Sequence, residues 1–309
     1  MKVVTMFMPL KMRTRKLTLM EGGAAGVLFG TAAVLIRLLH GLDQFSIAFW
    51  RLTIACGILA VILLFSGKLP ILKGYGLRDL RDFFVLGFLL GLHFVFFISA
   101  VKDTTILNAT VFVNTTPIFS VLISALLLNI KPSRLAAMGI LLSVAGACII
   151  AYAESFSNQV FFVGVAPSFK GDVEAILAAF VEAVYLNYGK RVRGQKAILP
   201  IMLPVYIFAA ITVGLLSLAG ADGKICLPTE PTVILPLLGL GVFPTALAHT
   251  LYFSSLSNLK SFETATMALL EPIGATALGI ILFNEFPAPL FVLGTSLVLL
   301  GIISIAKEE

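Results

Sequence analysis

The sequence predicts an all-α integral membrane protein whose ten transmembrane helices form two inverted five-helix repeats. Three observations predict this fold. Of the 309 residues, 59% are apolar and only 12% are charged, long apolar runs alternate with short connectors, and the second half of the chain repeats the first. Soluble chains carry roughly 25% charged residues, so this surface suits lipid better than water.

The ten predicted spans follow one another along the chain. Each is a run of about 20 mostly apolar residues, which is the length that crosses the hydrocarbon core of a bilayer. The runs cover residues 19–39, 45–66, 83–101, 106–128, 135–152, 172–189, 198–218, 233–256, 264–283 and 290–306. We expect a cytoplasmic N-terminal segment at 1–18, a first repeat at 19–152, a connector at 153–171 and a second repeat at 172–306.

Basic residues predict the orientation, because cytoplasmic connectors carry an excess of Lys and Arg. With both termini in the cytoplasm, few of the 22 Lys and Arg residues fall on the opposite face. Those few are Arg37, Lys102, Lys170 and Lys224, while Arg51 falls within the second predicted span. The asymmetry predicts a multi-pass protein with cytoplasmic termini. It also explains the net charge of +6 by topology, without a nucleic-acid partner.

The internal repeat appears when the chain is compared with itself at a shift of 155 residues. The matching pairs are Pro117 with Pro272, Asn129 with Asn284, Pro132 with Pro287, Gly139 with Gly294, and Gly146 with Gly301. His93 meets His249 with one residue of slippage. Pro117 and Pro272 are expected to kink their helices. An odd number of helices in each copy turns the second copy upside down, which is typical of secondary transporters with a site midway across the membrane.

Several short motifs accompany the repeat. They are Phe29-Gly30, Arg51, Pro117, Gly171-Asp172, Leu270-Glu271-Pro272 and Asn284-Glu285. Along essentially the whole chain, these motifs resemble the EamA-like, ten-helix branch of the drug/metabolite transporter superfamily. The sequence departs from that pattern at Ile130, where a glutamate is usual, and at Phe29, where tryptophan is common. The resemblance implies a plasma-membrane secondary transporter that exports small metabolites, such as amino acids, by alternating access, with proton coupling as one option.

Two glutamates within predicted spans are candidates for the solute or ion pathway. Ionisable groups at mid-membrane cost roughly 2.5–3.5 kcal/mol on insertion scales, so each needs an explanation. Glu182 shares a helix face with Tyr185, and Glu271 precedes Pro272, whose ring removes a helical hydrogen bond and would free the carbonyl of Ala268. The pair would bind a proton or a cation during transport. The alternative is a protonated glutamic acid that hydrogen-bonds neighbouring helices.

His93 and His249 could flank a central cavity as hydrogen-bond partners or proton acceptors. We favour the alternative, a neutral histidine packed between helices. The two lie on different spans without a second ligand one turn away, so no metal site is predicted. Asn114 and Thr115 belong to a polar stripe that leads to Pro117. Such a stripe suits a small zwitterionic or hydroxylated solute, or else supports hydrogen bonds between helices.

Arg51 follows Trp50 near the outer end of the second predicted span. Its guanidinium could attract an anionic group of a solute. Equally, it could extend to the membrane interface while Trp50 sits in the aromatic belt. We favour a structural or gating role for this arginine.

Motifs of enzymes and of ATP-driven pumps are missing from the sequence. It contains no HExxH, no GxSxG and no P-loop lysine motif, so it predicts facilitated or ion-coupled transport without a cofactor rather than catalysis. Two alternatives stay open. A sugar or nucleotide-sugar carrier would need more deep cationic residues than Arg51, and an intramembrane enzyme would leave the repeat unexplained. The expected partners are a small-molecule solute and the bilayer, and a homodimer is left open.

Overall fold

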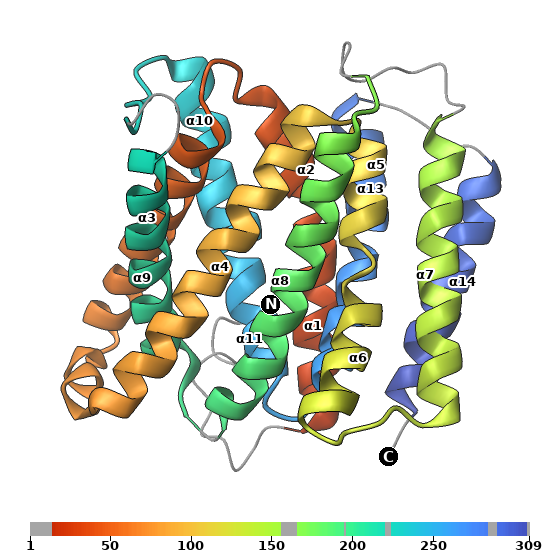
Figure 1. Ribbon diagram of the computed structural model, residues 1–309, viewed down its shortest axis with the longest axis horizontal. Coiled ribbons are helices and arrows are strands. Elements are labelled where there is room, and N and C mark those ends of the chain that lie inside the picture. Colours follow the sequence, from red (N-terminus) through yellow and green to blue (C-terminus); the bar gives the residue numbers. More distant parts are fainter. Residues whose placement is uncertain (1–13, 156–165, 195, 220–223, 284–288, 308–309) are drawn as a thin grey trace.

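The computed structural model describes residues 14–155, 166–194, 196–219, 224–283 and 289–307, and within these ranges it is a bundle of helices without strands. The helices stand side by side (Figure 1). Eight helical segments within the described ranges are long and apolar enough to cross a membrane. The chain is therefore a multi-pass α-helical membrane protein, which confirms the predicted fold class.

The first half of the chain supplies the helices of the first repeat. They are α1 (Arg15–Phe29), α2 (Thr31–Leu38), α3 (Gln44–Phe65), the 3₁₀ helix η3 (Leu69–Gly74), α4 (Leu77–Asp103), α5 (Ile106–Val113), α6 (Thr116–Leu127) and α7 (Arg134–Ser155). Gly41 and Gly67 turn the chain on either side of α3 with φ angles of +85° and +66°. Glycine adopts this left-handed backbone at little steric cost.

The second half supplies a matching series. It consists of α8 (Phe169–Arg193), α9 (Ile198–Ala219), α10 (Pro231–Leu240), the π-helical segment η4 (Gly241–His249), α11 (Thr250–Ser255), α12 (Ser261–Met267), the 3₁₀ segment η5 (Ala268–Leu270), α13 (Glu271–Phe283) and α14 (Pro289–Ala306). Two of the predicted spans, in α8 and in α12–η5–α13, are not among the eight apolar segments. The number ten therefore stays a prediction. Asn284, Glu285 and Pro287 lie outside the described residues.

The two halves run in opposite directions through the bundle. In Figure 1, α1 and α2 lead from the lower edge to the upper edge, whereas α8 leads from the upper edge to the lower. Helices of the two halves are interleaved: α4 packs against α8 and α9, α3 packs against α9, and α1 packs against α11, α12 and α13. The two repeats thus share one core rather than forming separate domains.

The contact between α7 and α14 shows the symmetry of the repeat. A Cβ atom placed on Gly139 would lie 2.6 Å from the carbonyl oxygen of Gly301, and one placed on Gly294 would lie 2.7 Å from that of Gly146. Because Gly139 corresponds to Gly294 and Gly146 to Gly301 in the repeat, these are one contact seen twice, as a two-fold axis requires. Ser143 donates to the carbonyl of Val298, its own repeat counterpart, at 3.2 Å. The two helices are therefore antiparallel, and the repeat is inverted.

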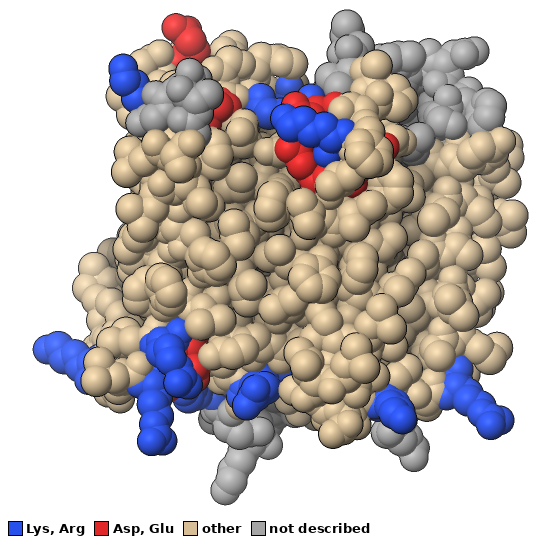
Figure 2. All heavy atoms as spheres, viewed as in Figure 1, with Lys and Arg blue, Asp and Glu red and all other residues tan. Residues whose placement is uncertain are grey.

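Charged side chains gather at the two ends of the bundle. Figure 2 shows Lys and Arg along the lower edge, a broad band without charged residues in the middle, and a mixture of acidic and basic residues at the upper edge. The lower edge holds the connections from α6 to α7 and from α8 to α9 (Figure 1). It is the edge that the sequence assigns to the cytoplasm. An uncharged belt between two charged rims is the surface expected of a chain that sits in a bilayer.

Candidate functional site

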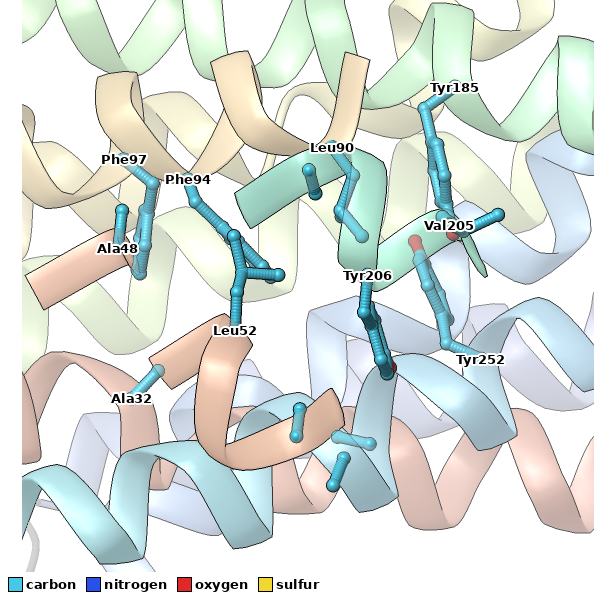
Figure 3. Close-up of a cluster of buried hydrophobic side chains, with 14 of the residues drawn as sticks. Ala32, Ala48, Leu52, Leu90, Phe94, Phe97, Tyr185, Val205, Tyr206 and Tyr252 are labelled. Carbon is cyan, nitrogen blue, oxygen red and sulfur yellow. The ribbon is translucent and has the colours of Figure 1, made fainter. Parts of the chain in front are cut away.

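A buried cavity lies between the two repeats and is lined by both. The first repeat contributes residues of α1 to α6, and the second contributes residues of α8, η4, α11, α12, η5 and α13. Phe94 and Phe97 of α4 and Tyr252 of α11 belong to this lining, and Figure 3 shows them within one cluster of buried side chains together with Tyr206 of α9. No single helix could form this cavity, since its wall needs helices from both halves.

Two interrupted helices reach the cavity at equivalent places in the repeat. α5 ends at Val113 and α6 begins at Thr116, while η5 separates α12 from α13 at Ala268. Val113 and Ala268 both line the cavity, and each lies four residues before a proline, Pro117 or Pro272. Proline lacks an N–H group and its ring excludes the carbonyl four residues earlier, so the regular helix breaks there.

The expectation that Pro272 leaves the carbonyl of Ala268 free is wrong. The backbone N–H of Glu271 donates to that carbonyl in a tight 3₁₀ turn. The first repeat closes its break differently, because the hydroxyl of Thr116 donates to the carbonyl of Val113 at 2.7 Å. The prolines therefore reshape the two helices without exposing bare carbonyl oxygen at these positions.

Glu182 and His93 meet at the cavity wall. Oε2 of Glu182 lies 3.2 Å from Nδ1 of His93, and both side chains are almost fully buried. The same Nδ1 lies 3.1 Å from the carbonyl oxygen of Ala178, which a protonated Nδ1 would satisfy. The ring of His93 stacks on that of Phe97 with their centroids 6.1 Å apart. The histidine is thus held in place, with a carboxyl group beside it.

His249 lies next to His93 across the two repeats. Their ring centroids are 6.1 Å apart, and the ring of His249 sits with its edge against Phe29 and Phe94, each at 4.8 Å. Both histidines line the cavity. Within the described ranges, no group of three or more His, Cys, Asp or Glu side chains is arranged to hold a metal ion.

Several polar atoms around the cavity are buried without a hydrogen-bond partner. They include Oε1 of Glu271, Nδ1 of His249 and the hydroxyl of Tyr252, and all three residues line the cavity. The great majority of buried polar atoms in proteins are hydrogen-bonded to protein or to water. The cavity therefore presents several buried polar atoms whose hydrogen-bonding capacity the described protein atoms do not use.

For Arg51 the sequence left two positions open, one facing a solute and one at the membrane interface. Its side chain is 1% exposed and it lines the cavity, so the interpretation that it extends to the membrane interface is wrong. Trp50 is half-buried, and its indole N–H donates to the carbonyl of Cys226 at 2.8 Å. Consecutive residues of a helix point about 100° apart, which sends the two side chains in different directions.

Some of the other predicted site residues line the cavity and some do not. Asn114 lines the cavity with Glu182, Glu271 and the two histidines, whereas Tyr185 and Thr115 do not. Tyr185 is fully buried and its ring packs 5.5 Å from that of Phe253. Thr115 donates to the carbonyl of Phe112 at 2.6 Å, and its neighbour Thr116 takes the place in the lining.

Tyr252 and Phe29 line the cavity although neither was expected there from the sequence. Tyr252 follows His249 by three residues, a spacing that puts two side chains on one helix face, so a signal for it was present. Phe29 ends α1, just before Gly30 and the start of α2 at Thr31. Its ring lies 5.2 Å from that of Tyr252, a contact between helices that no local pattern predicts.

The cavity is narrow in this conformation. Its volume is about 50 Å³, which is room for water molecules or a small polar group.

Comparison with known proteins agrees with this architecture. The model of the EamA-like transporter family matches the chain twice, at residues 22–152 and 169–307. An uncharacterized transporter of Archaeoglobus fulgidus is 28% identical over 88% of this chain and 91% of its own length, and one of Bacillus subtilis is 26% identical over 83% and 79%. A crystal structure with 19% identity has the same fold, with a TM-score of 0.72 over 93% of this chain and 96% of its own. The chain belongs to the EamA-like transporter family.

Proposed function

We propose that this membrane transporter is a secondary transporter that exports small metabolites, such as amino acids, by alternating access. The observation that carries the proposal is a cavity whose wall is built by both inverted repeats. Two copies related by a pseudo-two-fold axis can exchange roles, so that an inward-open and an outward-open state have similar free energies. A solute bound between the copies would then face each side of the membrane in turn.

The chemistry of the cavity supports a small zwitterionic solute. Its lining combines two carboxyl groups, Glu182 and Glu271, with the guanidinium of Arg51 and the amide of Asn114. An amino acid carries one positive and one negative group, so it suits a lining that contains both kinds of charge. A nucleotide sugar carries a diphosphate, which would need more positive charge than one guanidinium, and it would be repelled by ionised glutamates.

Coupling to protons would follow from the burial of the glutamates. A carboxylate buried away from bulk water needs a proton, a cation or a bound solute to compensate its charge. Oε1 of Glu271 has no hydrogen-bond partner, and its side chain is 6% exposed. We propose that Glu271 takes up a proton when the solute leaves, so that solute and proton cross the membrane in opposite directions.

The replacement Glu271→Gln tests this coupling. The variant keeps the size and a hydrogen-bonding group of the side chain but can no longer exchange a proton. We expect it to exchange solute across liposomes at a rate within a fewfold of wild type while losing accumulation driven by a pH gradient. The measurement is uptake of radiolabelled L-amino acids into proteoliposomes, with and without an imposed pH gradient, and the wild-type response to pH is measured first.

Glu230→Gln is the matched control, because Glu230 is exposed at the start of α10, outside the cavity. It should accumulate solute as wild type does. Unaltered accumulation by Glu271→Gln would make Glu271 a structural hydrogen-bonding group and would refute its role in coupling. A wild-type protein that equilibrates solute without any response to the pH gradient would be a facilitator.

A further inference from the structure

Arg51 is a buried cation without an acidic partner in the described part of the chain. Its side chain is 1% exposed, and its contacts are a hydrogen bond to a hydroxyl and an aromatic ring rather than an ion pair. Guanidinium groups stay charged in proteins. An uncompensated positive charge inside a membrane protein is costly, so a residue of this kind marks a functional site whose partner has to be found.

The side chain is held firmly in one orientation. Nε of Arg51 donates to Oγ1 of Thr245 at 2.9 Å, and Thr245 in turn donates its hydroxyl proton to the carbonyl of Leu240 at 2.6 Å. Cζ lies 3.9 Å from the centroid of the Phe94 ring, in the geometry of a cation–π contact. One edge and one face of the guanidinium are therefore fixed by the protein.

The π-helical segment η4 brings Thr245 to this position. A Cβ placed on Gly241, at its start, would lie 2.5 Å from a side-chain methyl of Ile54 in α3, so η4 touches α3 where a larger residue would not fit. Tyr206 donates its hydroxyl to the carbonyl of Thr245 at 2.8 Å. Elements of α9, η4 and α4 thus cooperate to orient one arginine of α3.

The outer end of the guanidinium is left without a partner. Nη1 of Arg51 is buried and makes no hydrogen bond, and the residue lines the cavity. Neither cavity glutamate forms an ion pair with Arg51. The ion-pair neighbour of Glu182 is His93, and Oε1 of Glu271 has no hydrogen-bond partner. The cavity therefore presents an oriented donor for an anionic group that the described chain does not supply.

We propose that Arg51 binds the carboxylate of the transported solute, so that the site takes small carboxylates, zwitterions included, and rejects solutes without one. The planar guanidinium matches a carboxylate through parallel hydrogen bonds, which a Lys ammonium does not reproduce. Binding would compensate the buried positive charge and satisfy Nη1 at the same time. This inference rests on the proposed function and adds to it the group that the protein recognises.

The experiment compares carboxylates with their neutral analogues. Thermal unfolding of the purified full chain is followed with a panel of L-amino acids and small monocarboxylates, each paired with its carboxamide, in a carboxylate-free zwitterionic buffer without added salt and in the same buffer with sodium chloride. Wild type should be stabilised by one or more carboxylates and not by the corresponding amides. Titration calorimetry then gives the affinity of the best carboxylate and of its amide.

Arg51→Gln should weaken binding of the carboxylate by roughly 10- to 100-fold, as loss of a charged hydrogen-bond partner does, and leave the weak affinity for the amide unchanged. Arg51→Lys keeps the charge but lacks the planar guanidinium, so its affinity for the carboxylate should lie between those of wild type and Arg51→Gln. Arg81→Gln is the matched control, since Arg81 is exposed beside Asp82, away from the cavity. It should bind as wild type does.

Several outcomes would overturn the assignment. They are equal stabilisation of wild type by acids and amides, no stabilisation by any carboxylate of the panel, and stabilisation by chloride alone. If Arg51→Gln does not fold, the comparison of acids with amides on wild type and Arg51→Lys decides instead. Carboxylate binding without transport in liposomes would refute the proposed function alone, and transport without preference for carboxylates would refute the role of Arg51 alone.

Discussion

Single glycines set how closely the first helix approaches the second repeat. A Cβ on Gly26 would lie 1.9 Å from the carbonyl oxygen of Met267, and one on Gly30 would lie 2.3 Å from the backbone nitrogen of Ala275. The contact is mutual, because a Cβ on Gly274 would lie 2.1 Å from the carbonyl oxygen of Val27. Small residues at such spacing let helix backbones touch. This contact joins the two repeats beside the cavity.

The replacement Gly26→Ala should destabilise the folded protein by about 1–3 kcal/mol or more, because the added methyl overlaps backbone that cannot move aside without shifting α12. Gly57→Ala is the matched control. Its Cβ would meet no atom within 4 Å, and Ala favours the helical backbone over Gly. The detergent-solubilised protein is heated and then run on size-exclusion chromatography. The measurement is the temperature at which half of the protein is lost from the monodisperse peak. Equal midpoints for the two variants would contradict the packing argument.

At the scale of whole elements, α8 is fastened to helices of both repeats by one buried amide. Nδ2 of Asn187 donates to Oγ of Ser120 in α6 at 3.1 Å, and its Oδ1 accepts from Oγ of Ser261, at the start of α12, at 2.7 Å. Asn187 is 3% exposed. Hydrogen bonds between helices are one of the forces that hold membrane helices together, since lipid leaves little hydrophobic drive between them.

Replacing Asn187 with Leu should lower stability by about 1–2 kcal/mol, because its hydrogen bonds to Ser120 and Ser261 on neighbouring helices are lost and the contact with each residue is worth roughly 0.6–1 kcal/mol in membrane proteins. Ser296→Ala provides the comparison, because the hydroxyl of Ser296 bonds only within its own helix, to the carbonyl of Val292. That variant should unfold as wild type does. The same heating assay measures both, and an unchanged midpoint for Asn187→Leu would show that α8 is held by packing alone.

The whole molecule is symmetric in the arrangement of its helices but asymmetric in the distribution of its charged residues. The inverted repeat makes the two ends of the bundle structurally similar, yet Lys and Arg dominate one edge whereas the other carries a mixture of acidic and basic residues (Figure 2). Charge rather than shape therefore sets the orientation in the membrane. The orientation itself stays a prediction, with both termini in the cytoplasm.

Cysteine labelling of intact cells tests the orientation. A variant that keeps Cys226 alone, with Cys56→Ala and Cys148→Ala, should react with a membrane-impermeant maleimide from outside, because Cys226 is exposed on the face expected to be external. With all native cysteines replaced, Lys73→Cys should react only after permeabilisation, since Lys73 is exposed in η3 on the opposite face. The reverse pattern would show that the protein sits the other way up.

Much of the fold follows from local features of the sequence. Long apolar runs predict helices in lipid wherever they occur, and the pairs at a shift of 155 residues predict two copies before any contact is known. The contact of α7 with α14 places those copies in inverted orientation. Glu182 and Glu271 could be singled out because a carboxyl group within an apolar run is costly anywhere in a membrane.

Tertiary structure decided the rest of the cavity lining. Thr116 replaces Thr115 in the lining because the helix breaks before Pro117, and Tyr252 enters it through a π-helical segment, which widens the turn and rotates the side chains that follow. Arg51 and Trp50 are neighbours in sequence but diverge around α3. Hydropathy and spacing fix which segments cross the membrane, while the rotation of each helix against its neighbours is set by packing between residues far apart in the chain.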